Sequence, residues 1–265
     1  MLLVTIRFSH FNEKARWALD LAGVAYEEEG HLPGFSNRAV KRHNPAGGSS
    51  DKASSRYSTP LLVLDDGAAL TDSSAIVRWA SERMGETLYP VPAVAELEHE
   101  LHDRLALHTR RVVYGYLFKS PMTLLRLASA NVPGPETWAL AATLPLVAHQ
   151  GYRRMVGGDE AFERSLRIVD EEVARWSAHL DGRDYLVGEQ FTAADLAFAC
   201  AMMPVVMPQH SEGFGAHLVP LDTVPAEPAG RIAVYRETLA GKHALRMFAE
   251  HRGTRVVPYG GEPER

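Results

Sequence analysis

The sequence predicts an α/β domain with the element order βαβ-ββα over residues 1–86, followed by an all-α domain over residues 94–265, with a linker at 87–93. Three observations support this. Short apolar runs alternate with helical patterns only in the first ninety residues. Pro90 and Pro92 interrupt the chain at the end of that block. Beyond them, apolar residues recur at helical spacing.

Composition limits the class of protein. With 265 residues, 46% of them hydrophobic and 23% charged, the chain can bury one large core or two modest ones. A net charge of −5 and a pI near 6.2 argue against nucleic acid as a partner. No apolar run is long enough for a membrane span, and the N-terminus lacks the basic segment of a signal peptide. The single cysteine, Cys200, fits a reducing cytoplasm and lies in an apolar helical pattern, which indicates a buried structural thiol.

The first strand and the first helix form the most informative stretch. Residues 2–6 are an apolar strand-like run, and a helix follows it up to Gly23, whose position is typical of a helix stop. Ser9 stands at the N-cap position, with its hydroxyl beside free N–H groups and the positive end of the helix dipole. Such a position holds an anion well. Two interpretations follow: Ser9 binds or activates an anionic group, or it only caps the helix.

The next elements complete the βαβ unit. Residues 24–29 read as a second strand, and a helix between two strands predicts a right-handed crossover and a parallel pair. Residues 38–43 favour a helical turn, which ends at the Asn-Pro-Ala-Gly-Gly run of 44–48. The polar, small residues of 49–58 are typical of a loop.

A hairpin and a helix finish the first domain. Residues 59–64 predict a strand that begins with proline, and a turn at 65–67 leads to a return strand at 68–71. Asp72 and Ser73 then open a helix with an apolar side.

Three long helical patterns mark the second domain, at 96–118, 161–180 and 192–206. Thr192 and Asp195 form a capping box at the start of the last one. Residues 120–158 and the proline-rich 204–228 give no assignment.

Three pieces of the first domain, in this order, resemble the soluble glutathione transferases. They are SHFNEKARWAL from Ser9, the Thr59-Pro60-Leu61 junction, and LTDSSAI from Leu70. The resemblance implies a thioredoxin-like N-terminal domain and a helical C-terminal domain. It also implies a serine-type, bacterial-like member, since Ser9 stands where other members carry cysteine or tyrosine. Glutathione would be the cosubstrate, no metal would be needed, and the protein would be a cytoplasmic homodimer.

The same resemblance implies roles for individual residues. Ser9 would stabilise the glutathione thiolate. Thr59 would precede a cis-Pro60 and present its backbone to the cysteinyl part of glutathione, whereas a trans proline would merely start a strand. Asp72 and Ser73 would hold the γ-glutamyl end, and an ordinary helix cap is the competing explanation.

The glycine carboxylate of glutathione needs a cation, and here the chain departs from the family. About eleven extra residues follow the Asn44-Pro45-Ala46-Gly47 run. Lys41, Lys52 and Arg56 are the candidates. The extra loop leaves open whether the thiol is glutathione or a modified form of it.

The electrophile pocket is expected between the domains, lined by Phe11 and by the long helix of 96–118. His108, Arg111, Tyr114 and Phe118 share a face of that helix and are the candidate wall residues. Core and solvated positions on a long helix are the alternative explanation.

Two polar clusters on the same helix receive other interpretations. His99 and His102 have ligand-like spacing, but without an HExxH motif or a cysteine cluster they do not predict a metal site. Arg110 and Arg111 are interpreted as an ion-paired or dimer-facing surface.

The free energy that Ser9 and its helix would have to supply to stabilise a thiolate can be compared with typical values. Lowering a thiol pKa from about 8.5 to about 6.5 requires about 2.7 kcal/mol of preferential stabilisation of the anion. One charge-assisted hydrogen bond contributes about 1.5–3 kcal/mol and a helix N-terminus about 0.3–1 kcal/mol. This arithmetic agrees with what the resemblance implies, an enzyme that activates the glutathione thiolate for attack on, or isomerisation of, a small hydrophobic electrophile. The alternative is a non-catalytic module of the same fold that binds ligands or mediates assembly.

Overall fold

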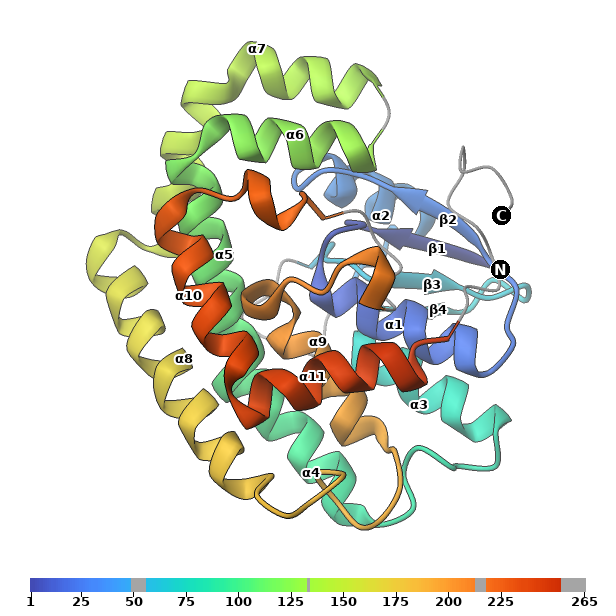
Figure 1. Cartoon of the computed structure of the whole chain (residues 1–265). Coiled ribbons are helices and arrows are strands. Elements are labelled where there is room, and N and C mark those ends of the chain that lie inside the picture. The colour runs from blue at the N-terminus through green and yellow to red at the C-terminus, as the bar shows by residue number, and fades with distance from the viewer. Residues whose placement is uncertain (49–55, 133, 213–217, 254–265) are drawn as a thin grey trace.

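The computed structural model describes residues 1–48, 56–132, 134–212 and 218–253. Its N-terminal domain contains a four-stranded sheet in the order β2-β1-β3-β4 (Figure 1). Strands β1 (Leu2–Thr5) and β2 (Glu27–Gly30) are parallel, while β3 (Leu61–Val63) pairs antiparallel with β1 and with β4 (Ala69–Leu70). The predicted order and the parallel crossover are confirmed.

Helices cover both faces of this sheet. Leu3 and Leu62 pack on one face with residues of α1 (His10–Leu21) and α3 (Ser73–Arg83). Val4 and Leu61, their neighbours along the strands, pack on the other face against α2 (Phe35–His43). The period-two alternation of a strand thus divides its apolar residues between two layers.

The strands are shorter than predicted. The second strand begins at Glu27 rather than at residue 24, because parallel pairing with β1 starts only where the Glu27 N–H meets the Met1 carbonyl at 3.0 Å. Val24 and Tyr26 are buried but lie outside the ladder. Gly23, with φ of +63°, follows the end of α1 as expected.

The C-terminal domain is helical in its described parts, as predicted. Its elements are α4 (Pro92–Leu101), the π-helical turn η1 (His102–Ala106), α5 (Leu107–Lys119), α6 (Pro121–Asn131), α7 (Gly134–Gly151), the π-helical turn η2 (Tyr152–Val156), α8 (Asp159–His179), α9 (Ala193–Val206), the 3-10 turns η3 (His210–Glu212) and η4 (Leu221–Thr223), α10 (Ala226–Glu237) and α11 (Leu239–His251).

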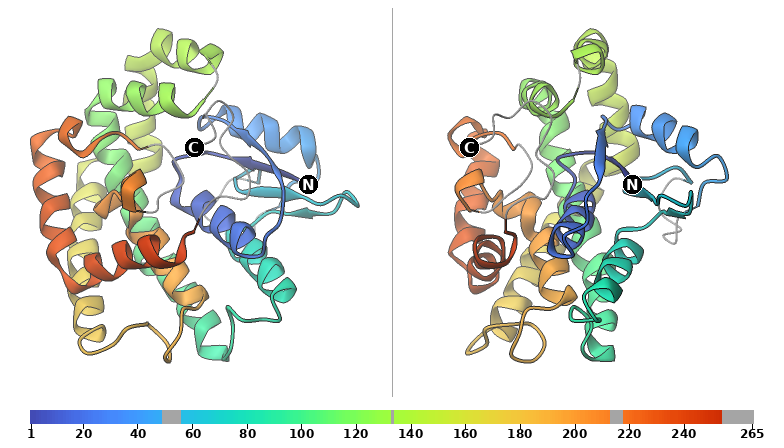
Figure 2. Two further views of the ribbon diagram at one scale, coloured as in Figure 1. Left: turned by 45° about the vertical axis from the view of Figure 1, so that its right-hand side comes forward. Right: turned by 90° about the vertical axis from the view of Figure 1, so that its right-hand side faces the viewer.

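Two of these elements differ from the sequence-based expectation. The helix expected at 96–118 is α4 and α5 joined through η1, and it begins at Pro92, inside the predicted linker, because proline suits the first turn of a helix. The unassigned stretch 120–158 contains α6 and α7, which form a pair at one end of the molecule (Figure 2).

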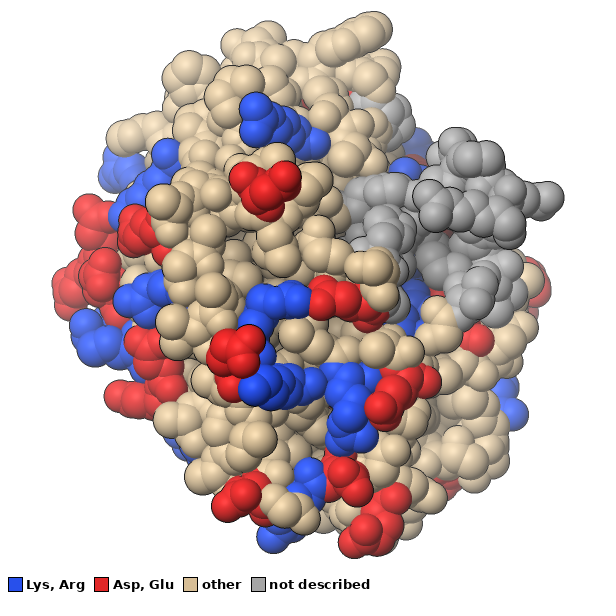
Figure 3. Space-filling view, viewed as in Figure 1, with Lys and Arg blue, Asp and Glu red and all other residues tan. Residues whose placement is uncertain are grey.

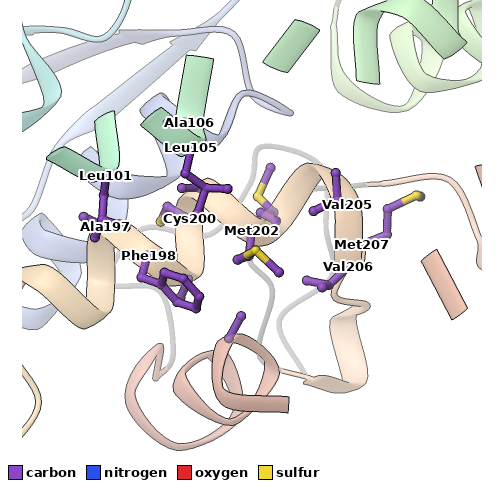
Figure 4. Packing of buried hydrophobic residues seen from close by; sticks show 14 of the residues in the cluster. Leu101, Leu105, Ala106, Ala197, Phe198, Cys200, Met202, Val205, Val206 and Met207 are labelled. Carbon is purple, nitrogen blue, oxygen red and sulfur yellow. The ribbon is translucent and has the colours of Figure 1, made fainter. Parts of the chain in front are cut away.

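Helix α9 is the centre of the C-terminal core (Figure 4). All 14 of its residues are buried, and it contacts α1, α4, α5, α10 and α11. The predicted capping box is confirmed: the Asp195 carboxylate accepts hydrogen bonds from the Thr192 N–H and hydroxyl, both at 3.0 Å. Cys200 is buried within this helix, and burial raises the pKa of its thiol. The prediction of a buried thiol is confirmed.

Among the described helices, none combines the length and the apolar character that a bilayer crossing requires.

A buried ion-pair cluster joins the two domains. Glu13 of α1 accepts from Arg16 at 2.7 Å and from Arg252, beyond α11, at 2.5 Å. Arg252 also reaches Asp20 at 2.9 Å, and these side chains are at most 1% exposed. Burial alone would raise the pKa of Glu13, but Arg252 and Arg16 lower it to about 2. The cluster therefore fixes α1 against the C-terminal end of the helical domain.

Two further contacts span the domains. Lys14 of α1 pairs with Glu98 of α4 at 2.5 Å, with both side chains 5% exposed. His31 contacts Glu136 of α7, whose carboxylate also accepts from the Leu32 N–H at 2.8 Å.

We expect Glu13→Gln to lower the free energy of unfolding by about 1.5–3 kcal/mol at neutral pH, because Arg252 and Arg16 would each lose a buried anionic partner and keep only Asp20 and Glu28, respectively. Glu237→Gln is the matched control. Its partner Lys242 lies 3.1 Å away, both side chains are exposed, and the expected loss is below about 1 kcal/mol. Urea denaturation measures both values.

The pH dependence of the same difference is a further test. Because the folded state lowers the pKa of Glu13 from 4.5 to about 2, its stabilisation is present above the unfolded value and is lost as the pH falls through the folded value. The gap between wild type and Glu13→Gln should therefore narrow between pH 5 and pH 2. A gap independent of pH would contradict the ion-pair explanation.

Candidate functional site

Ser9 lies between β1 and α1, at the N-cap position. Its backbone N–H donates to the Ile6 carbonyl at 2.8 Å, and its carbonyl accepts from the N–H groups of Asn12 and Glu13. Its hydroxyl makes no capping hydrogen bond, which corrects the expectation that the side chain itself caps the helix. The backbone turn holds Ser9 in place, so its hydroxyl is available to bind a ligand at the positive end of the helix dipole.

The Thr59-Pro60 peptide bond has the cis geometry that the family resemblance implies. Pro60 is buried, and the Asn12 side-chain amide donates to the Thr59 hydroxyl at 3.3 Å. This bond joins the entry to β3 to the first turn of α1. The structure thus brings Thr59 close to the helix that Ser9 begins.

Asp72 and Ser73 begin α3 on the same side of the sheet. The Asp72 carboxylate accepts from the Ser74 N–H at 2.7 Å, so the capping role is present. Ser73 is buried, and the neighbouring Ser74 hydroxyl accepts from Lys14 at 2.8 Å. A glutathione-binding role for Asp72 and Ser73 stays a prediction.

The two candidate cations in the described part of the chain, Arg56 and Lys41, are exposed. Arg56 donates to the Ala46 carbonyl at 2.9 Å and 2.6 Å, which ties the two ends of the extra loop together. Lys41 lies over the Tyr57 ring, 5.9 Å from its centroid. Lys52 lies outside the described residues.

An apolar cavity of about 100 Å³ opens between the domains at Ser9. Phe8, Ser9 and His10 form its N-terminal-domain wall. Mostly apolar residues of α5, α6, α9 and α10 and of the segment before α10 form the rest, among them Val113, Leu117, Leu127, Met203, Val219 and Ile232. A cavity of this kind accepts a small apolar molecule next to whatever Ser9 holds.

One face of α5 lines the cavity, and it is not the face that was expected. Arg110, Val113, Tyr114 and Leu117 line it at the i, i+3, i+4, i+7 spacing of a helical stripe, and Val112 and Tyr116 line it as well. Of the predicted wall residues, only Tyr114 belongs to this stripe.

The other predicted wall residues have different neighbours. His108 and Arg111 hydrogen-bond to the Ser165 hydroxyl of α8 at 3.1 Å and 3.0 Å. Phe118 is buried and stacks on Tyr114, with ring centroids 5.6 Å apart. Phe11 lies between the rings of His10 and His102, at 4.0 Å and 5.2 Å. None of these four side chains lines the cavity. The rotation of a helix about its own axis decides which side chains face a cavity, and sequence spacing does not fix it.

Two residues of the cavity wall, His10 and Arg110, were not predicted to line it. His10 is buried, and its Nε2 has no hydrogen-bond partner among the described residues. Burial, and then the charge of Arg110, lower the pKa of His10 to about 3, so the ring is neutral at physiological pH. Burial also raises the pKa of Tyr114 to about 12, which keeps its hydroxyl protonated. The sequence signal that could have identified Arg110 is its four-residue spacing from Tyr114, which places the two on one face of a helix.

Within the described ranges, histidine, cysteine and carboxylate side chains form no group of three or more that could hold a metal ion.

Two family models match parts of this chain. Residues 8–83 match the model of the glutathione S-transferase N-terminal domain, and residues 138–213 match that of the C-terminal domain. The chain belongs to the soluble glutathione transferase family. No curated protein matches the chain.

Solved structures show the same fold at low identity. Glutathione transferase GSTFuA2 from Phanerochaete chrysosporium is 16% identical, with a TM-score of 0.60 over 95% of this chain and 98% of that one. A glutathione S-transferase of Ceriporiopsis subvermispora in complex with glutathione is 14% identical, with a TM-score of 0.56 over 96% and 98%. A glutathione S-transferase from Methylobacterium radiotolerans in complex with glutathione sulfonate is 19% identical, with a TM-score of 0.51 over 100% and 97%.

We expect His10 to stay neutral from pH 8 down to about pH 4, because burial and Arg110 oppose its protonation. The ¹⁵N shifts of its imidazole, assigned by comparison with His10→Gln, should not change in this range. A His10 midpoint near 6.5 would contradict the buried, cation-facing position.

Proposed function

We propose that this protein is a glutathione transferase that uses Ser9 to stabilise the glutathione thiolate for attack on a small hydrophobic electrophile, or for its isomerisation. One observation carries the proposal: Ser9 both begins α1 and forms part of the wall of the interdomain cavity. A sulfur atom held at Ser9 would therefore face the cavity where an apolar electrophile fits.

The energetic requirement agrees with this position. The Ser9 hydroxyl is not used for capping, so it can donate to a thiolate, and the N-terminus of α1 adds its dipole. Together they supply about 2–4 kcal/mol, against the roughly 2.7 kcal/mol needed to lower a thiol pKa by two units. Conjugation, dehalogenation and glutathione-dependent isomerisation all use this same thiolate.

The rest of glutathione would extend along the N-terminal domain. Thr59, beside cis-Pro60, would pair its backbone with the cysteinyl part, and Asp72 and Ser73 would take the γ-glutamyl end. Lys41 or Arg56 would serve the glycine carboxylate, and Phe11 would lie at the sulfur end. Two of the similar structures carry glutathione or its sulfonate, which supports glutathione as the thiol. The proposal includes a cytoplasmic homodimer that needs no metal.

A non-catalytic role in assembly is the second candidate, and one surface favours it. Helix α7 exposes Trp138 at 73% and Leu146 at 58%, and Met122 of α6 is 60% exposed. The space-filling view shows few charged side chains at this end of the molecule (Figure 3). An apolar surface of this kind is typical of protein contacts. A role in assembly through this surface does not require that Ser9 be catalytic.

A thermal-shift titration with reduced glutathione separates these functions. A binding site predicts a saturable rise in Tm that follows RT ln(1 + [L]/Kd), and the rise should be lost in Ser73→Ala. No shift at millimolar concentration would contradict the glutathione site.

We expect Ser9→Ala to reduce turnover of glutathione with 1-chloro-2,4-dinitrobenzene at least about tenfold, because one charge-assisted hydrogen bond to the thiolate is lost. The rise in Tm with glutathione should remain, since other residues hold the tripeptide. Ser129→Ala, on the exposed side of α6, is the matched control and should be fully active. Near-normal turnover in Ser9→Ala would remove Ser9 from the mechanism.

A further inference from the structure

Four polar side chains of the interdomain cavity belong to the start of α1 and to the facing helix: Ser9 and His10, and Arg110 and Tyr114 of α5. Most of the wall is aliphatic or aromatic, and its other polar residues are Ser120, Thr123, Arg231, Tyr116 and Tyr235. Arg110 and Tyr114 lie one helical turn apart on α5, so both side chains serve the same part of the cavity. An occupant of this cavity therefore meets apolar surface along its body and polar groups near Ser9.

Arg110 is the charged residue among these four, and it has no ion-pair partner among the described residues. No carboxylate of the described residues forms an ion pair with it, and its one aromatic contact there is with the Phe11 ring, 5.5 Å from the guanidinium. Arg231, the other arginine of the wall, differs because Asp170 pairs with it at 3.3 Å. A half-buried guanidinium beside an apolar cavity is only partly hydrated, so an anion brought by a ligand would gain more there than at an exposed arginine.

The neighbours of Arg110 add donors and no negative charge. Tyr114 keeps its hydroxyl proton, and its ring is buried. His10 is neutral, and its Nε2 is buried without a partner among the described residues. Of the described side chains at this end of the cavity, Arg110 alone is therefore charged. That charge and the Tyr114 hydroxyl together suit a planar anion with two acceptor oxygens.

We propose that Arg110 binds the carboxylate of an apolar, ring-containing acid, so that the electrophile of this enzyme is an aromatic or similarly apolar carboxylic acid whose ring occupies the aliphatic part of the cavity. This inference rests on the proposed function, since it names the substrate class of the same site. It assigns Arg110 a role in specificity, because discrimination comes from pairing one cation with one anion.

The test uses ligand binding without glutathione. Isothermal titration with 2-naphthoate and with 2-naphthamide compares an anion with a neutral molecule of nearly the same shape. We expect Arg110→Gln to raise the Kd of 2-naphthoate at least about tenfold and that of 2-naphthamide less than about threefold. Arg110→Lys, which keeps the charge, should retain most of the preference for the acid. Arg167→Gln, an exposed charge of α8 outside the cavity wall, should change neither ligand.

Three results would overturn the inference. Equal losses for both ligands in Arg110→Gln would mean that Arg110 only shapes the cavity. Unchanged 2-naphthoate binding would place the anion elsewhere, and failure of the wild type to prefer the acid over the amide would exclude the substrate class. The glutathione titration is independent of all three: a protein that fails it but discriminates the two naphthalenes through Arg110 would lose the proposed function and keep the acid site.

Discussion

The buried ion pairs of Glu13 with Arg16 and Arg252 are the constraint on which the rest of the molecule depends. Charges that are almost fully removed from water are tolerated only when each has a close partner, and here the partners come from opposite ends of the chain. Helix α1 can therefore occupy one position against the helical domain. Because Ser9 begins α1 and the opposite cavity wall belongs to the helical domain, this cluster also sets the width of the cavity.

Much of the fold was predictable because its signals are local. Gly23, Asp72 and the Thr192–Asp195 box each act through backbone groups within a few residues, so their sequence positions are enough to place helix ends. The strand order followed from the helix between the first two strands and from the hairpin at 65–67. Ser9 was placed at the start of α1 by the same local logic, although its hydroxyl leaves the cap to the backbone.

The parts that escaped prediction depend on tertiary contacts. Helices α6 and α7 gave no amphipathic signal because α7 turns apolar residues such as Trp138 and Leu146 outward. The cavity face of α5 was missed for a related reason. An apolar helix packed on several sides offers more than one apolar stripe, and only its neighbours decide that Arg110 faces the cavity while His108 faces Ser165.

The π-helical turn at His102–Ala106 sets the phase of the helix that follows. Its backbone closes from the Leu107 N–H to the His102 carbonyl, one residue wider than an α-helical turn. Each residue of an α-helix turns the chain by about 100°, so if these residues continued as a regular α-helix instead, all of α5 would be rotated by about that angle. Arg110 and Tyr114 would leave the cavity and other side chains would replace them, with every wall residue still present in the chain. The wide turn therefore decides, together with the residues of the wall themselves, which ligand the cavity can take.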